Sequence, residues 1–211
     1  MSLLPPVKSR DFAPLLTGAD YAEVFVERSQ GLSLRFEDSR VEDIGASHDQ
    51  GLGLRYLRRQ DGDIVTLQGS SQAVDAAAAA VLRQGLFNAK PAGTAPLMRP
   101  QALHRHIVRI DPAEIPLSEK ISLLKRIDAV LRGEFPKIRQ VTLSYSERKR
   151  DLVIMNSEGA DCREERTSVI FSVSIVAEEN GVLQTGHEVI GGLKGYEMLS
   201  DYDPLAFSRV A

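Results

Sequence analysis

The sequence has only one cysteine, Cys162, among its 211 residues, so the chain cannot form an internal disulfide. A single cysteine also excludes a zinc site built from several cysteine ligands of one chain. A protein without disulfides suits a reducing compartment, and we expect a cytoplasmic location. No apolar run approaches the roughly 20 residues that span a bilayer, and the N-terminus lacks the apolar core of a secretory signal. We therefore expect no membrane association.

The sequence also lacks an excess of positive charge. Its 26 basic and 29 acidic residues give a net charge of −3, whereas domains that coat nucleic acids are usually clearly basic. Two basic clusters, Arg55–Arg59 and Arg148–Arg150, adjoin acidic turns or hairpin tips, where solvated charges are expected. We expect no nucleic-acid partner, and a local phosphate-binding patch is the alternative.

The composition is that of an ordinary globular protein, with 43% hydrophobic and 26% charged residues. In the first third, apolar residues alternate with polar ones, as in Ala22, Val24 and Val26, which predicts strands. Turn signals lie at Glu37–Arg40 and Gln60–Asp63. We predict an antiparallel meander of about four strands between Tyr21 and Leu67.

Two helices are predicted in the middle of the chain. Ser70 or Ser71 caps an alanine-rich helix that runs to about Phe87. Its small side chains would let it lie close to a sheet, or they reflect helix propensity alone. Ser118 is the predicted cap of a second helix, which ends at Gly133. Residues 90–101, which contain three prolines, form an extended connector between the two helices.

The remaining apolar patterns predict further strands, separated by turns at Ser146–Arg150, at Asn156–Gly159 and at the Asn-Gly pair Asn180-Gly181. These strands cover 141–145, 152–155, 167–177 and 182–190. The order of strands, two helices and strands predicts an α+β fold, in which two main helices pack on antiparallel β-meanders as a two-layer sandwich.

The predicted domain organisation has three parts: a leader over 1–18, one α+β domain over 19–200, and a linker helix that starts within 201–211. Asp203 is a helix cap, and Pro204 suits the first helical position. The helix lacks a stop signal before Ala211. We therefore expect the chain to be the front part of a longer protein.

The pair His187-Glu188 resembles the first half of the zinc-binding HExxH helix, in which two histidines one turn apart bind the metal. The residue four positions after His187 is Gly191, which has no ligating side chain. Gly191, Gly192 and Gly195 would also weaken a helix by roughly 1 kcal/mol each. The pattern favours the end of a strand followed by a glycine-rich loop.

Other candidate chemistry is equally incomplete. His104 and His106 would share one side of a strand, and with His187 they form an alternative in which the chain itself is a metal enzyme. His48 and its neighbour Asp49 would point to opposite faces of a strand. Cys162 lies among acidic residues, which disfavour a reactive thiolate. The residues alone predict no catalytic or metal-binding residue in this chain.

Several ordered blocks resemble one known family, the TldD/PmbA proteins. They extend over nearly the whole chain from Ala19 and lean toward the TldD branch. The blocks are Asp20–Val24, Glu37–Asp43, Asp49–Arg55, Phe171–Gly181 and Gly191–Glu197.

The resemblance implies a cytosolic zinc metallopeptidase that works as a pair of related subunits, in a family also named for modulation of DNA gyrase. The family's HExxxH motif lies in its C-terminal part and is absent here. Zinc is therefore expected in a missing C-terminal domain, and this chain is predicted to be inactive alone. Residues His187–Ile190 replace part of a run of small residues that the TldD branch usually shows.

The resulting functional hypothesis is a domain that supports the metal-bearing part, forms a subunit interface and restricts access to extended peptides. Its partners would be a related subunit, in a hetero- or homodimer, and a peptide or unfolded protein substrate. The candidate substrate or interface loop contains Gly191, Gly192, Gly195 and Tyr196. The alternative is a stand-alone protein-binding module, for example one that contacts DNA gyrase. An HExxxH motif encoded in frame after Ala211 would favour the enzyme.

Overall fold

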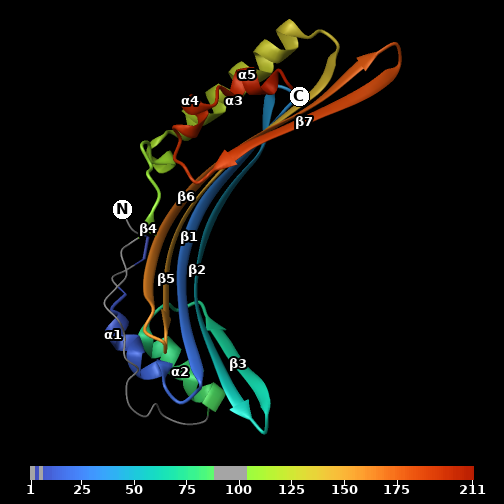
Figure 1. The fold of residues 1–211 in the computed structure, drawn as a ribbon. Coiled ribbons are helices and arrows are strands. Elements are labelled where there is room, and N and C mark those ends of the chain that lie inside the picture. The colour runs from blue at the N-terminus through green and yellow to red at the C-terminus, as the bar shows by residue number, and fades with distance from the viewer. Residues whose placement is uncertain (1–2, 5–6, 88–103) are drawn as a thin grey trace. The chain divides into compact units, whose positions relative to one another are not determined.

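The computed structural model describes residues 3–4, 7–87 and 104–211, so the connector predicted at 90–101 lies outside the described residues. Helices and strands follow one another as shown in Figure 1. In chain order they are α1 (Ser9–Phe12), η1 (Ala13–Leu16), β1 (Tyr21–Glu37), β2 (Arg40–Gln60), β3 (Asp63–Ser71), α2 (Ala76–Phe87), β4 (His104–Arg105), η2 (Pro112–Glu114), α3 (Leu117–Glu134), β5 (Ile138–Asn156), β6 (Asp161–Glu179), β7 (Val182–Gly192), α4 (Met198–Asp201) and α5 (Pro204–Ser208).

The strands form one sheet in the order β3-β2-β1-β5-β6-β4, and β7 also pairs with β6. The β2–β3 and β6–β7 pairs are antiparallel, whereas the short β4 runs parallel to β6. Long antiparallel strands joined by tight turns, with two main helices, confirm the predicted α+β fold.

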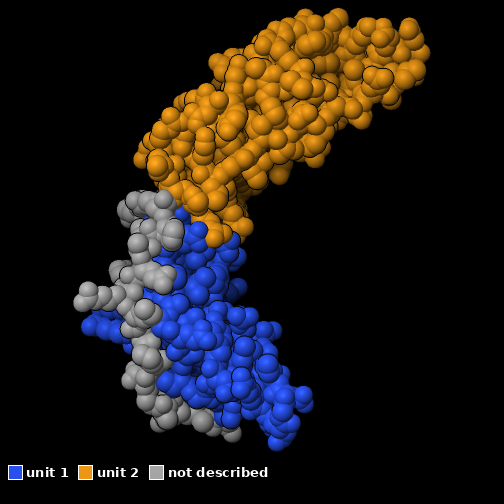
Figure 2. Space-filling view, in the orientation of Figure 1, with its two compact units in different colours: residues 1–29, 48–105, 150–165 blue, residues 30–47, 106–149, 166–211 orange. Residues whose placement is uncertain are grey.

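The chain forms two compact units, coloured separately in Figure 2. Unit 1 contains residues 1–29, 48–105 and 150–165, and unit 2 contains residues 30–47, 106–149 and 166–211. Strands β1, β2, β5 and β6 contribute residues to both units.

The core of unit 2 lies between α3 and the sheet. Leu124, Ile127 and Leu131 recur at helical spacing on one face of α3, and all three are buried. They pack against alternating residues such as Val141 and Leu143 of β5, which share one face because side chains two positions apart point the same way. Helices α4 and α5 lie on the same side of the strands as α3 (Figure 1).

The core of unit 1 includes residues that the sequence analysis assigned to a leader. Phe12, Leu15 and Leu16 of α1 and η1 are buried among side chains of β1, β2 and β5. The buried Tyr56 donates a hydrogen bond of 2.7 Å to the Leu15 carbonyl oxygen, and burial raises the pKa of Tyr56 to about 12. Helix α2 packs closely on β3, because Gly69 leaves room for Leu82, 3.4 Å from where a Cβ would lie.

The structure corrects three local predictions. Between Tyr21 and Leu67 the chain forms three strands, because β1 and β2 are long and continuous. Helix α2 is capped not by Ser70 or Ser71, which belong to β3, but by Asp75, whose carboxylate accepts the Ala78 N–H at 2.8 Å. Helix α3 begins at Leu117 after Pro116, one residue before the predicted cap.

The turn predicted at Ser146–Arg150 is also wrong, because β5 runs straight through it. Its charged residues suggested a solvated turn, yet two of them have ion-pair partners within unit 2. Glu147 lies 2.6 Å from Lys120, and Lys149 lies 3.0 Å from Asp111. A run of charged residues is therefore no turn signal by itself, because charged side chains can lie on the surface of a strand or pair with distant partners.

The remaining turn predictions are confirmed. Asp38 and Ser39 both have positive φ angles between β1 and β2, as do Asn180 and Gly181 between β6 and β7. Two consecutive positive φ values are the signature of the tight hairpin turn that Asn-Gly favours. The predicted cap of the last helix is also correct, since the Asp203 carboxylate accepts the Leu205 N–H at 3.0 Å.

Candidate functional site

Strand β7 is an edge strand: within the described residues it is hydrogen-bonded to β6 alone. Its sequence contains neither lysine nor proline, two residues that often protect edges from further pairing. Val182, Leu183 and Val189 expose 52–64% of their surface, an unusual fraction for large apolar side chains. An edge with these properties can accept another extended chain through main-chain hydrogen bonds.

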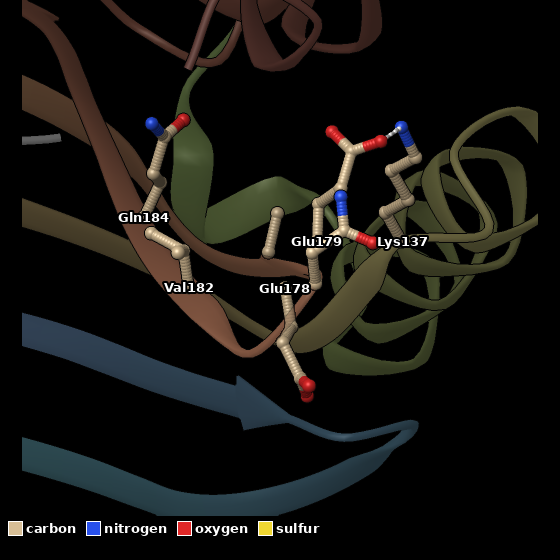
Figure 3. A pocket seen from close by; sticks show the side chains of 7 residues that line it. Lys137, Glu178, Glu179, Val182 and Gln184 are labelled. Carbon is tan, nitrogen blue, oxygen red and sulfur yellow. Dashed lines mark hydrogen bonds and ion pairs between the residues drawn. The ribbon is translucent and has the colours of Figure 1, made fainter.

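The β6–β7 hairpin also borders a hollow of about 340 Å³ (Figure 3). Val182 and Gln184 of β7 lie on one side of it, and Glu179 and Lys137 lie together on the other. Lys137 forms an ion pair with Glu179, while Arg139 pairs with Glu178 at 3.0 Å. Both carboxylates are therefore neutralised by neighbours, and the hollow has mixed charge.

The four predicted loop residues fall into two places with different environments. Gly191 and Gly192 end β7, opposite Ile170 and Val169 of β6. A Cβ on Gly191 would lie 3.0 Å from Ile170 Cγ1, whereas no described atom lies within 4 Å of a Cβ on Gly192. These two glycines therefore extend the open edge.

Gly195 and Tyr196, by contrast, belong to a buried clamp. The Tyr196 N–H donates a 2.9 Å hydrogen bond to the carbonyl oxygen of Ile110, and a Cβ on Gly195 would lie 2.1 Å from that same oxygen. The Tyr196 ring is half-buried, and its centroid lies 6.2 Å from that of Tyr145. Burial, followed by the charges of Glu119 and Glu147, raises the pKa of Tyr196.

Glu197 completes the clamp and was not singled out from the sequence. Its buried carboxylate accepts main-chain N–H groups from Gly195 at 3.0 Å, Ile110 at 3.0 Å and Arg109 at 3.2 Å. Burial opposes ionisation, but the three N–H donors outweigh it and hold the pKa of Glu197 below its usual value. Residues 109–110 are thereby fixed to the segment that follows β7.

We predict that Glu197→Gln lowers the free energy of unfolding by about 2 kcal/mol near pH 7, because hydrogen bonds to a charged acceptor are the stronger ones. A depressed carboxyl pKa stabilises the fold above the unfolded pKa of roughly 4.3, and this stabilisation disappears as pH falls through the folded pKa. Denaturant unfolding between pH 7 and pH 3 should show the difference between wild type and variant shrinking below about pH 5. Glu188→Gln is the control. A difference that stays constant with pH would contradict this role.

A second deeply buried cluster lies beside the clamp. The Lys120 ammonium group donates to the Pro112 carbonyl oxygen at 2.8 Å and lies 5.6 Å from the centre of the Tyr145 ring. Glu147 binds both Lys120 and the Tyr145 hydroxyl. Burial and the hydrogen bond to Glu147 raise the pKa of Tyr145, so its phenol stays protonated. This cluster joins η2, α3 and β5 of unit 2.

The pair His187-Glu188 lies within β7, as the strand prediction required. His187 is opposite Ser174 and Glu188 is opposite Val173, so the two side chains point to opposite faces of the sheet. The zinc motif needs a helix that places two histidines on one face, whereas His187 lies in a strand and the position of the second histidine is occupied by Gly191.

The other candidates are dispersed. His48 and Asp49 are consecutive in β2, His104 belongs to the short β4, and His106 follows it. Cys162 is half-buried in β6. Across residues 3–4, 7–87 and 104–211, no group of three His, Cys, Asp or Glu side chains could hold a metal ion. The zinc implied by the family resemblance therefore has no suitable ligand set in the described part of this chain.

Several residues of the two predicted basic clusters contact carboxylates or an aromatic ring within their own unit. Arg55 pairs with Glu23 at 3.3 Å, and Arg58 lies over the Phe87 ring. Lys149 and Arg150 each have a carboxylate partner within their own unit.

The helices of the described residues include none with the length and apolar character needed to cross a membrane.

A further hollow, of about 500 Å³, lies in unit 1. The strands β1, β2 and β3 contribute its lining, which includes Gly51 and Gly53 of β2. The sequence analysis did not identify this hollow. Two glycines separated by one residue in a strand were the available signal, because they remove adjacent side chains from the same face.

Two family models match the chain. One, for the PmbA/TldA metallopeptidase domain 1, matches residues 22–84, and the other, for the central domain, matches residues 110–211. The chain belongs to the PmbA/TldD metallopeptidase family. The central-domain match contains the Lys120 cluster, the β7 edge and the clamp except Arg109, and the domain 1 match contains the lining of the unit 1 hollow.

The relatives and solved structures agree with this assignment. A metalloprotease of Methanocaldococcus jannaschii is 24% identical over 192 residues, covering 89% of this chain and 42% of the relative. A metalloprotease TldD homologue of Haemophilus influenzae is 27% identical over 189 residues, covering 84% and 37%. The chain thus spans about two fifths of the length of these relatives.

Two solved structures show the same fold. A proposed modulator of DNA gyrase from Thermotoga maritima has a TM-score of 0.66 and 12% identity, and covers 90% of this chain and 42% of its own. TldE from Thermococcus kodakarensis has a TM-score of 0.60 and 13% identity, with coverages of 83% and 40%.

Proposed function

We propose that this chain is a non-catalytic part of a PmbA/TldD-type metallopeptidase that supports the metal-bearing segment and receives extended peptides at the β7 edge. The observation that carries the proposal is this open, apolar edge strand within the region that matches the metallopeptidase central domain. Extended substrates suit such an edge because main-chain pairing is independent of sequence, whereas pockets beside it can select side chains.

The clamp supports the proposal by explaining how β7 is held. Glu197 and Gly195 fix the segment after β7 to residues 109–110, so the strand's end cannot move freely relative to unit 2. Gly191 and Gly192 leave the last part of the edge accessible to another main chain. The zinc ion and its HExxxH ligands would be provided by a segment outside residues 1–211, and a related subunit would be the partner.

The first test is proteolysis. We expect the purified 211-residue chain, demetallated and then supplied with zinc, to leave reduced and carboxymethylated α-lactalbumin intact. Gel electrophoresis over several hours provides the measurement, and a zinc peptidase of known activity is the positive control. Zinc-dependent cleavage by this chain would refute its non-catalytic role.

The second test is strand addition. The same permanently unfolded protein should slow amide hydrogen exchange in residues 182–192, because an added strand protects edge N–H groups. Residues 63–68 of strand β3, at the opposite end of the strand order and outside the lining of the unit 1 hollow, are the internal control. Protection that is absent from β7, or equal in β3, would contradict the proposed peptide edge.

A second candidate is a stand-alone module that binds DNA gyrase, favoured by the description of the Thermotoga maritima structure. Calorimetric titration of this chain into gyrase separates the candidates. Saturable binding, together with no protection of β7 by unfolded protein, would favour the module.

A further inference from the structure

The unit 1 hollow is a trough on one face of the sheet. Phe25 and Glu27 of β1 line it, together with Gly51 and Gly53 of β2 and Ser70 of β3. Ser70 is paired directly with Gly53. The intervening residues of β1 and β2 are buried on the opposite face, against α1, η1 and α2. The trough therefore lies on the face of unit 1 that faces away from its helices.

The two glycines are not required by the described contacts of this chain. Neither has a positive φ angle. No described atom lies within 4 Å of where a Gly53 Cβ would be, and the nearest to a Gly51 Cβ is the Ser71 carbonyl oxygen, at an ordinary 3.7 Å. Glycine weakens a strand, and in this position it often marks close approach by a ligand or another backbone.

Next to the trough, on the same face of the sheet, an arginine side chain of this chain is bound between an aromatic ring and a carboxylate. The guanidinium group of Arg55, from β2, lies 5.9 Å from the centre of the Tyr21 ring and 3.3 Å from the Glu23 carboxylate. Tyr21 and Glu23 are two residues apart on β1, so ring and carboxylate lie side by side. Together they hold a guanidinium by cation–π attraction and charge.

Strand β1 repeats this arrangement four residues later with Phe25 and Glu27. Strands β1 and β2 are neighbours joined by a two-residue turn, so they run antiparallel. Moving four residues forward along β1 therefore means moving four residues back along β2, from Arg55 to Gly51. Phe25 and Glu27 therefore lie beside Gly51, whereas the equivalent pair, Tyr21 and Glu23, lies beside an arginine.

We propose that the trough binds the guanidinium group of an arginine side chain in an extended peptide segment. Phe25 provides the ring. Glu27 already pairs with Arg150 at 2.5 Å, so the principal new charge partner is Asp49, an exposed trough residue that pairs with no basic side chain in the described residues. The volume of about 500 Å³ lies within the roughly 300–1,000 Å³ of typical ligand sites and leaves room for residues flanking the arginine.

This site does not depend on the proposed peptidase function, because it lies in unit 1, whereas β7 lies in unit 2. Exposed charges bind weakly and are screened by salt, so we expect rapid, salt-sensitive binding. Arginine is favoured over lysine because its planar group can stack on Phe25 while it donates to carboxylates.

The test is a nuclear magnetic resonance titration of the 211-residue chain with the tripeptide acetyl-Gly-Arg-Gly-amide. We expect saturable shifts in the amides of residues 49–53 and 70–72. The peptide with citrulline, a neutral isostere of arginine, should bind at least about tenfold more weakly, since it lacks the charge. Free arginine amide, which lacks the flanking residues, should also bind more weakly.

Three variants examine the mechanism. Gly53→Val should retain the fold, because its side chain meets open space, yet weaken binding at least about tenfold by filling the trough. In Gly51→Arg, the guanidinium group of the introduced arginine should occupy the site and block peptide binding. Asp49→Asn should weaken peptide binding and make it depend less on salt concentration. Gly85→Ala, an exposed change in α2 with open space around its Cβ and outside the trough and the β7 edge, is the control and should bind as wild type.

An unchanged affinity in Gly53→Val, or equal binding of arginine and citrulline peptides, would overturn the assignment. The absence of saturable shifts in the folded wild-type chain would overturn it as well. Free arginine amide binding as well as the tripeptide would refute recognition of a peptide segment.

Discussion

Gly195→Ala is expected to lower the free energy of unfolding by roughly 3 kcal/mol, because the added methyl group would overlap main-chain atoms. The added Cβ would lie 2.1 Å from the Ile110 carbonyl oxygen and 2.7 Å from Val108 Cγ1. The oxygen belongs to the main chain and already accepts the Tyr196 N–H, so it cannot move without breaking that bond. Chemical denaturation measured by circular dichroism would give the change.

Gly192→Ala provides the matched control for this experiment. It is also close to the end of β7, but no described atom lies within 4 Å of its added Cβ. Its stability should stay within about 0.5 kcal/mol of wild type. Similar values for the two variants would mean that the clamp does not restrict Gly195. A destabilised Gly195→Ala should also exchange the Ile110 and Tyr196 amides faster than wild type.

Lys120→Ala is expected to cost about 3–5 kcal/mol, since removal of one partner leaves the other charge buried without compensation. The side chains of Lys120 and Glu147 are 3% and 12% exposed. Glu147 would keep only its bond to the Tyr145 hydroxyl among the contacts described above, and the Pro112 carbonyl oxygen would lose its donor. Denaturant unfolding at neutral pH measures this effect.

Lys137→Ala is the corresponding control, because Lys137 also forms an ion pair with a glutamate but both side chains are about 60% exposed. An exposed pair contributes less than about 1 kcal/mol, so this variant should be nearly as stable as wild type. The double variant Lys120→Met/Glu147→Leu should recover part of the loss by removing both buried charges. If Lys120→Ala and Lys137→Ala lowered the free energy of unfolding equally, burial would not determine how much an ion pair contributes to stability.

The two largest predicted effects lie in the same part of unit 2 as the β7 edge. The clamp fixes the segment after β7, and the Lys120 cluster fixes η2 and α3 to β5. Both are largely buried arrangements whose polar groups bind main chain or each other. They suit a support that holds an open strand in place, which is the role proposed for this part of the chain.

Much of the fold could be predicted from the sequence because its signals are local. The positive φ angles at Asn180 and Gly181 follow from the Asn-Gly pair, and the helical spacing of Leu124, Ile127 and Leu131 indicated the buried face of α3. The predictions were wrong where the local structure depends on contacts with residues that are far away in the sequence. The charges around Glu147 suggested a turn because their partners, Lys120 and Asp111, are 27 and 38 residues away in sequence.

The candidate site was less predictable for the same reason. The Gly195-Tyr196-Glu197 block was recognised as a family resemblance, but its physical role depends on the main chain of Arg109 and Ile110, 87–88 residues earlier. The trough depends on Phe25 and Gly51 being brought together by neighbouring strands. Sequence spacing shows neither contact.

The sequence by itself determined the α+β class, the alternating faces of the strands and the family, because periodicity, turn chemistry and ordered blocks are properties of consecutive residues. Only the tertiary structure decided which glycines are confined and which border open space, and which charges are paired. Those properties depend on the atoms that long-range strand pairing and helix packing place around each residue, and such neighbours are far away along the chain.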